Sequence, residues 1–487
     1  MGRMIKQLLR IGRREGWRSL RPSRRDLLKT ALIGTAAGVA GGKASLIFAQ
    51  PARFRRVAVI GGGFAGLACA VTLQEAGVDV TLLEAESRSG GRVLTDRKLI
   101  PGEAVELGGE FVGANHPTWI AFAERYGLTL TEVPEDEGAE AYILRGKLIR
   151  GHQLKNLHDE IESVLEKLIE MAKEIDPIRP FAAANAAALD GQSFLEFVSQ
   201  AAISDDAKTI LIADEESDNG VPAGRMSLLA YVSMIAGGGF EDYFESSETH
   251  GCAGGNDALA SAMAAALGDR LQSRSAVKSI ERTKESARIS TEAGQVIEAD
   301  AVVLAIPPTA WEQIAFDPPL PRRLKPQFGQ NVKLIVKCDS PFWKATDIAP
   351  EIYSDGLIQV AWKSAEGDEG VAYTMFNGAD KTAALRALPA DARARAACDA
   401  LAPAFPKLID RVTRDIFMDW PAQPRVKGSY SFPAPGQVTR FGPTLVDGVD
   451  DGLARLMFAG EHTSFAFIGY MEGALSSGVR VAKALIG

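Results

Sequence analysis

The segment that most constrains the fold runs from Val57 to Ala85, VAVIGGGFAGLACAVTLQEAGVDVTLLEA. A short apolar run is followed by a glycine-rich turn, a segment of helical character and a second apolar run that ends at Glu84. This order is typical of a strand–turn–helix–strand unit whose parallel strands are buried on both faces. We therefore expect an α/β domain that binds a dinucleotide at the turn.

The spacing Gly61-x-Gly63-x-x-Gly66 gives each glycine a role. The first allows a tight turn, the second leaves bare backbone against a pyrophosphate, and the third lets the helix pack closely on the strand. The start of the helix adds free N–H groups and a positive dipole end for the phosphates. Ala65, in the same turn, is assigned to the cofactor with them. The pattern predicts a Rossmann-like domain.

Glu84 lies where a carboxylate can accept hydrogen bonds from both ribose hydroxyls of an adenosine. An acid here disfavours NADP, whose phosphate requires a cation, but it does not separate NAD from FAD. Ala85 follows directly and is assigned to the same contact. Cys69 falls within the predicted helix, where we expect a small core residue and not a reactive thiol.

The N-terminus differs in kind from the rest of the chain. Residues 1–29 are rich in Lys and Arg, and a mild Gly/Ala-rich apolar run follows to Ala49. This pattern is typical of an export signal, and the pair Arg24-Arg25 resembles the twin-arginine type, with Leu27 where that motif usually has Phe. Two alternatives stay open: a basic arm that binds membrane or nucleic acid, and an uncleaved signal that tethers the protein.

Removal of residues 1–49 would leave 43 basic and 60 acidic residues, a net charge of −17. Such an acidic body is not expected to bind nucleic acid. The predicted export partner is the twin-arginine translocation machinery, which moves folded proteins that often already hold their cofactor. NAD is scarce outside the cytoplasm, whereas tightly held FAD travels with its protein. The predicted periplasmic or otherwise exported location therefore favours FAD.

The cysteines and histidines indicate what the chain does not contain. The four cysteines form no CxxC pair and the five histidines form no HExxH motif. Neither a disulfide framework nor a metal site is expected.

The 487 residues suffice for two or three domains. Three separated segments, 55–113, 250–311 and 441–487, are predicted to build the FAD-binding domain. Two inserts, 114–249 and 312–440, are predicted to form a mixed α+β substrate domain, of which the first insert is mostly helical. This arrangement predicts an active site at the interface between the two domains.

Apolar spacing predicts the elements of the inserts. Leu154 to Ile175 repeats with helical period, and Tyr142 to Ile149 reads as a hairpin with glycine at its turn. Further predicted elements are strands at 332–336 and 357–362 and helical segments at 190–235 and 380–402.

Four more motifs follow the glycine turn in order: ESRSGGR at 86–92, ELGGEFVG at 106–113, FAGEHTS at 458–464 and GYMEGA at 469–474. With these motifs, the chain from about residue 55 to its C-terminus resembles the flavin-dependent amine oxidases, which include monoamine, polyamine and L-amino acid oxidases. The resemblance implies a Rossmann-like FAD-binding domain interrupted by a substrate domain.

The resemblance also implies the residues that hold FAD. The ADP half is assigned to Gly61, Gly63, Gly66, Glu84, Gly91 and Arg92. The backbone of Val277 matches the position that meets the adenine, and Glu461 and Met471 match positions at the ribityl chain and the pyrimidine edge of the flavin. Gly109 and Glu110, in the second motif, are assigned to the cofactor site as well.

Three residues are implied at the reacting centre. Lys333 matches a lysine that holds a water near flavin N5, where a cation favours negative charge on the flavin or on oxygen. Its alternative is a surface lysine at a strand end. Tyr430 and Tyr470 match the two walls of an aromatic cage that guides an amine. The alternative for Tyr430 is core packing.

Ser429 stands where the mammalian monoamine oxidases have a cysteine bound covalently to the flavin. The resemblance therefore implies FAD held without a covalent bond by that route. His116, His250 and His462 are isolated in the sequence and are expected to be structural.

The implied activity is oxidation of a small-molecule amine to an imine, which water hydrolyses to a carbonyl compound. Either O2, giving H2O2, or an electron carrier is the acceptor, and a homo-oligomer is possible. A primary ammonium costs about 4–5 kcal/mol to neutralise at pH 7, and an apolar aromatic pocket offsets part of this cost.

Two alternatives stay open. The first is an L-amino acid oxidase, although Glu110 and Phe111 follow the glycine pair where those enzymes commonly place an arginine. Glu110 either steers a cationic amine or is solvated. The second is a flavin-dependent desaturase or isomerase, or a flavin-binding protein without turnover.

Overall fold

The computed structural model describes residues 54–321 and 324–487. The predicted signal segment, 1–49, lies outside these residues. Among the helices of the described part, none combines the length and the apolar character that a membrane span requires.

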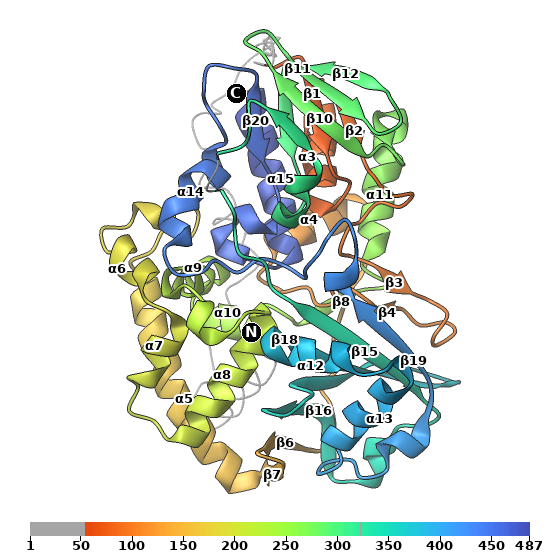
Figure 1. The fold of residues 1–487 in the computed structure, drawn as a ribbon. Coiled ribbons are helices and arrows are strands. Elements are labelled where there is room, and N and C mark those ends of the chain that lie inside the picture. The colour runs from red at the N-terminus through yellow and green to blue at the C-terminus, as the bar shows by residue number, and fades with distance from the viewer. Residues whose placement is uncertain (1–53, 322–323) are drawn as a thin grey trace, which may run out of the picture.

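A parallel five-stranded sheet lies in the upper half of Figure 1, in the order β20-β13-β1-β2-β9. Its central strand, β1, pairs with β13 on one side and with β2 on the other. The strands are β1 (Arg56–Ile60), β2 (Asp79–Leu83), β9 (Leu271–Gln272), β13 (Ala301–Leu304) and β20 (Arg455–Phe458). Segments far apart in the sequence therefore build one sheet, and the predicted α/β, Rossmann-like class is confirmed.

The two faces of this sheet are covered differently. Val57 and Val59 of β1 pack with α3 (Phe64–Glu75) and α15 (Met471–Ile486), whereas Ala58 and Ile60 pack against a four-stranded sheet. The four strands, in the order β12-β11-β10-β14, are β10 (Val277–Arg282), β11 (Ala287–Thr291), β12 (Val296–Ala299) and β14 (Ala315–Asp317). Because both faces are covered, β1 is apolar throughout its buried length.

Helices α3 and α15 approach closely. A Cβ built on Gly478 of α15 would lie 2.2 Å from the carbonyl oxygen of Ala65, so only glycine fits at this crossing. Cys69 lies on the same face of α3 and is fully buried, as expected, and burial raises the pKa of its thiol to about 12. A thiol with this pKa is protonated and inert.

A mixed seven-stranded sheet occupies the lower right of Figure 1, in the order β19-β15-β18-β17-β16-β6-β7. Its strands are β6 (Ala139–Leu144), β7 (Lys147–Arg150), β15 (Asn331–Cys338), β16 (Ile348–Ser354), β17 (Val360–Gly367), β18 (Gly370–Gly378) and β19 (Val412–Asp419). The predicted hairpin is therefore β6–β7, with its turn at Arg145 and Gly146, which both have positive φ. Helices α12 (Ala379–Ala387) and α13 (Ala390–Ala400) follow β18, so the predicted helical segment 380–402 is two helices.

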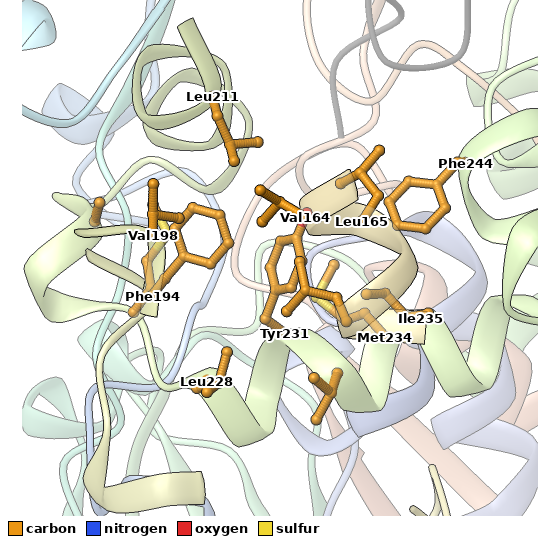
Figure 2. Packing of buried hydrophobic residues seen from close by; sticks show 14 of the residues in the cluster. Val164, Leu165, Phe194, Val198, Leu211, Leu228, Tyr231, Met234, Ile235 and Phe244 are labelled. Atoms are coloured by element: carbon orange, nitrogen blue, oxygen red, sulfur yellow. The ribbon is translucent and has the colours of Figure 1, made fainter. Parts of the chain in front are cut away.

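A cluster of helices forms the left side of Figure 1. The predicted helix at 154–175 is α5, Gly151–Ala172, which ends before Ile175. Its apolar face shares one hydrophobic core with α7, α8, α9 and α10, and Figure 2 shows Val164 of α5 near Tyr231 of α9 and Leu165 of α5 near Phe244 of α10. These four helices are α7 (Phe194–Ser199), α8 (Asp205–Asn219), α9 (Leu228–Gly238) and α10 (Glu241–Ser246). The predicted helical segment 190–235 is thus several helices, because Gly220 ends α8 in the left-handed conformation and Ser227 caps α9.

The other α-helices and strands complete the described part of the chain. They are β3 (Thr95–Asp96), β4 (Val105–Glu106), α4 (Pro117–Arg125), β5 (Leu130–Glu132), α6 (Ala186–Gly191), β8 (His250–Cys252), α11 (Asp257–Leu267) and α14 (Gln437–Asp447).

Candidate active site

A cavity of about 590 Å³ is lined both by the β1–α3 turn and by strands of the seven-stranded sheet. All of the predicted site residues except Gly66 line it. They are Gly61, Gly63, Ala65, Glu84, Ala85, Gly91, Arg92, Gly109, Glu110, Val277, Lys333, Tyr430, Glu461, Tyr470 and Met471. The structure thus brings together residues separated by more than 400 positions.

The three glycines of the turn differ in what surrounds them. A Cβ on Gly66 would lie 1.9 Å from the carbonyl oxygen of Gly61, so Gly66 is required for the turn itself and does not reach the cavity. Gly61 has φ +107°, a conformation that favours glycine. A Cβ on Gly63 would meet no protein atom within 4 Å. Its bare backbone faces the cavity.

The start of α3 is suited to an anion. Gly63 is the N-cap of this helix and contributes no side-chain hydrogen bond, so the first N–H groups are not capped by a side chain. Gly91 lies against Gly63, since a Cβ on Gly91 would be 3.3 Å from the Cα of Gly63. A helix N-terminus beside bare glycine backbone is a phosphate-binding arrangement.

Glu84 lies at the end of β2 with its carboxylate held by the backbone. One oxygen accepts from the N–H of Gly62 at 2.6 Å and the other from the N–H of Glu86 at 2.7 Å. Burial raises its pKa, while these two bonds lower it. Each carboxylate oxygen keeps a further lone pair, so the predicted contact with ribose stays a prediction.

Arg92 forms an ion pair with the buried carboxylate of Glu461, which lies on a distant segment of the chain. Arg92 Nη1 lies 2.8 Å from Glu461 Oε1 and also donates to the carbonyl of Ser429 at 2.7 Å. Burial would raise the pKa of Glu461, but Arg92 and the hydroxyl of Ser431 outweigh it and lower the pKa below its usual value. Glu461 is therefore a carboxylate in the folded protein.

Met471, the first residue of α15, contacts the 106–113 motif at Gly109. A Cβ on Gly109 would lie 3.1 Å from the Sδ of Met471. The 106–113 motif and the 469–474 motif therefore meet at one wall of the cavity.

Tyr430 and Tyr470 line the same cavity. The hydroxyl of Tyr430 donates to the carbonyl of Asp218, and that of Tyr470 lies 3.4 Å from Glu248 Oε1. The ring of Tyr430 lies against the backbone of Gly469, the residue before Tyr470. Burial raises the pKa of both phenols well above 10, so both stay neutral.

Lys333 lies on β15 and is 6% exposed, so the alternative of a surface lysine is wrong. Its Nζ lies 3.1 Å from the carbonyl of Glu106, 2.9 Å from that of Gly108 and 2.6 Å from Glu110 Oε2. The alternative of a solvated Glu110 is also wrong, because this carboxylate is paired with Lys333.

The three histidines lie in different surroundings. His116 accepts a hydrogen bond at Nδ1 from the N–H of Gly113, and the Nδ1 of His250 lies 2.8 Å from the hydroxyl of Thr249. His462 is buried at the cavity wall, and burial lowers its pKa to about 4 although Glu461 raises it. It is therefore neutral near pH 7.

The residues present fit FAD. The cavity combines bare glycine backbone and a helix N-terminus with a carboxylate beyond them, in a volume usual for cofactor sites. Gly63 in particular has space that a side chain would fill and no protein atom uses.

Among the residues of the cavity wall that were not predicted from the sequence are Asp218, Glu248 and Trp362. For Asp218, the sequence contains one signal that could have identified it. Leu211, Asp214 and Asp218 share one face of α8 by their spacing, and acids on an otherwise apolar helix face are unusual. Glu248 lies in a loop and Trp362 in a strand that reads as ordinary sheet, so neither carries a local signal.

Comparisons with known proteins agree with this geometry. A family model described as flavin containing amine oxidoreductase matches residues 64–486. The probable flavin-containing monoamine oxidase A of Dictyostelium discoideum is 27% identical over 463 residues, covering 88% of this chain and 96% of that protein. Human flavin-containing amine oxidase B is 28% identical over 464 residues, covering 88% of this chain and 86% of its own.

Solved structures are similar over the same extent. A double mutant of putrescine oxidase superposes with a TM-score of 0.82 at 25% identity, covering 89% of this chain and 99% of that chain. Cyclohexylamine oxidase from Brevibacterium oxydans IH-35A gives a TM-score of 0.81 at 25% identity with the same coverage.

Proposed function

The chain belongs to the flavin-containing amine oxidoreductase family, and we propose that it is an exported enzyme that oxidises a small-molecule amine with non-covalently bound FAD. The carbon–nitrogen bond is oxidised to an imine, which water hydrolyses to a carbonyl compound and an amine. Bound FAD would accept the two electrons and pass them to O2, giving H2O2, or to another acceptor.

One observation carries this proposal: Tyr430 and Tyr470 line the same cavity as the glycine turn around Gly63. The faces of neutral phenols attract a cation, and their rings exclude water. The bond from the Tyr430 hydroxyl to the carbonyl of Asp218 fixes that ring. Removing water from an ammonium disfavours its charged form, which yields the neutral amine that the reaction requires.

The charges of the cavity wall favour an amine without a carboxylate. Asp218 and Glu248 line the cavity near the two tyrosines. The three arginines of the described lining are engaged elsewhere: Arg92 with Glu461, Arg88 with backbone carbonyls, and Arg425 with Gln313 and Glu292. The L-amino acid alternative therefore has no arginine beside the tyrosine pair in the described part of the chain.

Ser429 supports non-covalent binding. Its hydroxyl lies 2.6 Å from Asn331 Oδ1 within the buried wall, and its carbonyl accepts from Arg92. A serine at this position offers no thiol for a bond to the flavin. We expect acid precipitation to release all of the flavin into the supernatant, and flavin that stays with the pellet would contradict non-covalent binding.

Export rests on the basic, Gly/Ala-rich character of residues 1–49. We propose recognition by the twin-arginine translocation machinery. The double substitution Arg24→Lys and Arg25→Lys should keep the full-length protein, with its flavin, in the cytoplasm. Unchanged export of this variant would contradict the proposed route.

The reaction is tested by mixing the chain from residue 50 onward, prepared with its flavin, anaerobically with primary, secondary and polyamines and with L-amino acids. Loss of the visible flavin band with amines that lack a carboxylate is the expected result, and admitting air then tests O2 as acceptor. Reduction by amino acids alone would favour the L-amino acid oxidase, and no reduction by any compound would favour a desaturase, an isomerase or a protein without turnover.

Substitution tests the role of the tyrosine pair. Tyr430→Phe and Tyr470→Phe should slow this reduction strongly. Tyr126→Phe is the matched control, because Tyr126 is not part of the cavity wall. Equal rates of flavin reduction in all three variants would contradict the proposed role of the tyrosine pair in the reaction.

A further inference from the structure

The ammonium group of Lys333 lies among protein acceptors. An ammonium carries three N–H donors, and three acceptors surround this one: the carbonyls of Glu106 and Gly108 and the carboxylate of Glu110, at 3.1, 2.9 and 2.6 Å. The carboxylate is the nearest of the three. Lys333 is therefore held by the protein and paired with a charge of opposite sign, and its predicted contact with a water near the flavin stays a prediction.

Glu110 is held on both of its carboxylate oxygens. Oε2 accepts from Lys333, and Oε1 accepts from the indole N–H of Trp362 at 2.8 Å. The backbone is fixed as well, since the side chain of Asn256 donates to the carbonyl of Glu110 at 2.7 Å. Glu110 is thus held at both carboxylate oxygens and at its backbone carbonyl, which fixes the position of the side chain.

The pair is isolated from solvent but open to the cavity. The side chains of Lys333 and Glu110 are 7% and 11% exposed, and both line the cavity. Of the described carboxylates, that of Glu110 alone is ion-paired with Lys333. The nearby carboxylate of Glu106 is turned to Thr95 and to the N–H of Asn256.

We propose that Glu110 is a positioning residue that neutralises the charge of Lys333 beside the flavin. The inference rests on the proposed function only in placing the flavin in this cavity. The wall then presents a dipole and no net charge to the cofactor. A lone buried cation at the same place would favour electron density on the flavin far more strongly.

The consequence is a lower reduction potential of the bound flavin than an unpaired lysine would give. Reduction adds negative charge to the flavin, and a nearby cation stabilises that charge. Glu110→Gln keeps the size of the side chain and removes its charge, so Lys333 becomes an uncompensated cation. The potential should rise.

The test is the midpoint potential of the FAD-loaded protein, measured by equilibration with a reference dye. Glu110→Gln should raise the ratio of reduced to oxidised flavin at a given dye ratio about tenfold, which for a two-electron couple is about 30 mV. Lys333→Met combined with Glu110→Gln should return the potential to near the wild-type value, because both charges are gone. Glu110→Asp, which keeps the charge, should also stay near wild type and covers the case in which Glu110→Gln fails to fold.

Glu366→Gln is the matched control, because Glu366 forms an exposed pair with Lys344 at 3.0 Å. The midpoint potential of the flavin in the Glu366→Gln protein should be unchanged. A Glu110→Gln protein with normal flavin content and an unchanged or lower potential would overturn the inference, as would a Glu110→Asp protein with a raised potential. A flavin-loaded chain that shows the predicted shifts but oxidises no amine would overturn the proposed reaction alone.

Discussion

The guanidinium of Arg92 lies 2.8 Å from the carboxylate of Glu461, although 369 residues separate them in the chain. The same carboxylate accepts from the hydroxyl of Ser431 at 2.6 Å and from the N–H of Gly469 at 3.1 Å. One buried carboxylate therefore connects the 86–92 motif, the segment of Tyr430 and the segment of Tyr470.

Breaking this ion pair should destabilise the protein. Arg92→Met would leave the carboxylate of Glu461, which is 4% exposed, without its cation. Removing one partner of a buried pair costs about 3–5 kcal/mol, so we expect the free energy of unfolding, measured in urea, to fall by about that amount. Flavin content should fall with it.

Arg150→Met is the control for Arg92→Met. Arg150 pairs with Asp347 at 2.9 Å, but both side chains are largely exposed. Exposed pairs contribute about 0–1 kcal/mol. Equal urea midpoints for the two variants would contradict a structural role for the Arg92–Glu461 pair.

Two glycines of one turn should respond differently to alanine. In Gly63→Ala the new methyl meets no protein atom, so the flavin-free protein should melt at the wild-type temperature. The methyl would enter the space predicted for the pyrophosphate, and overpacking costs about 1–3 kcal/mol, so the dissociation constant of FAD should rise about tenfold or more.

Gly66→Ala, in contrast, should fail to fold, because its Cβ would lie 1.9 Å from the carbonyl oxygen of Gly61. Gly251→Ala is the control, since its Cβ meets no atom within 4 Å and lies outside the cavity wall. If Gly63→Ala binds FAD with wild-type affinity, the prediction that the pyrophosphate lies against Gly63 is wrong.

Acid should destabilise the protein partly through His462. The unfolded chain protonates this imidazole near pH 6.5, whereas burial lowers its pKa in the folded protein to about 4. Because the unfolded state binds more protons in this window, stability falls as the pH is lowered from 6.5 to 4, by about 3 kcal/mol in total at 1.36 kcal/mol per pH unit. His462→Phe should therefore show a shallower loss of stability in urea unfolding at pH 4.5 relative to pH 7.5.

His158 has a pKa lowered to about 4 by burial as well, so part of the acid sensitivity should remain in His462→Phe. The exposed His152 offers a control, and His152→Asn should leave the pH dependence as in the wild type. An unchanged slope in His462→Phe would show that His462 does not stay neutral in the folded protein.

Local patterns were sufficient for most of the elements. The apolar run of β1, the glycine turn and the helix behind it follow from steric and hydrogen-bonding rules that act over a few residues. The hairpin β6–β7 and the helix α5 follow for the same reason. The ends of elements were predicted less well, as at Ile175, because the end of a helix depends on what packs beside it.

The site was predicted mainly through motifs whose glycines or charged residues have a fixed local role. Lys333 was assigned through the family resemblance, but its partner Glu110 could not be paired with it, because 223 residues separate them. Asp218 and Glu248 were missed, since an acid in a helix or a loop looks solvated until the fold buries it.

By itself the sequence determined a Rossmann-like unit and the family, because turn geometry and phosphate binding require particular residues at short, fixed spacings. The tertiary structure alone decided which charges meet. Which group pairs with Lys333, and whether Glu461 pairs with Arg92, depends on contacts between segments that the sheet order brings together. Such contacts are set by packing over long separations, and no local pattern encodes them.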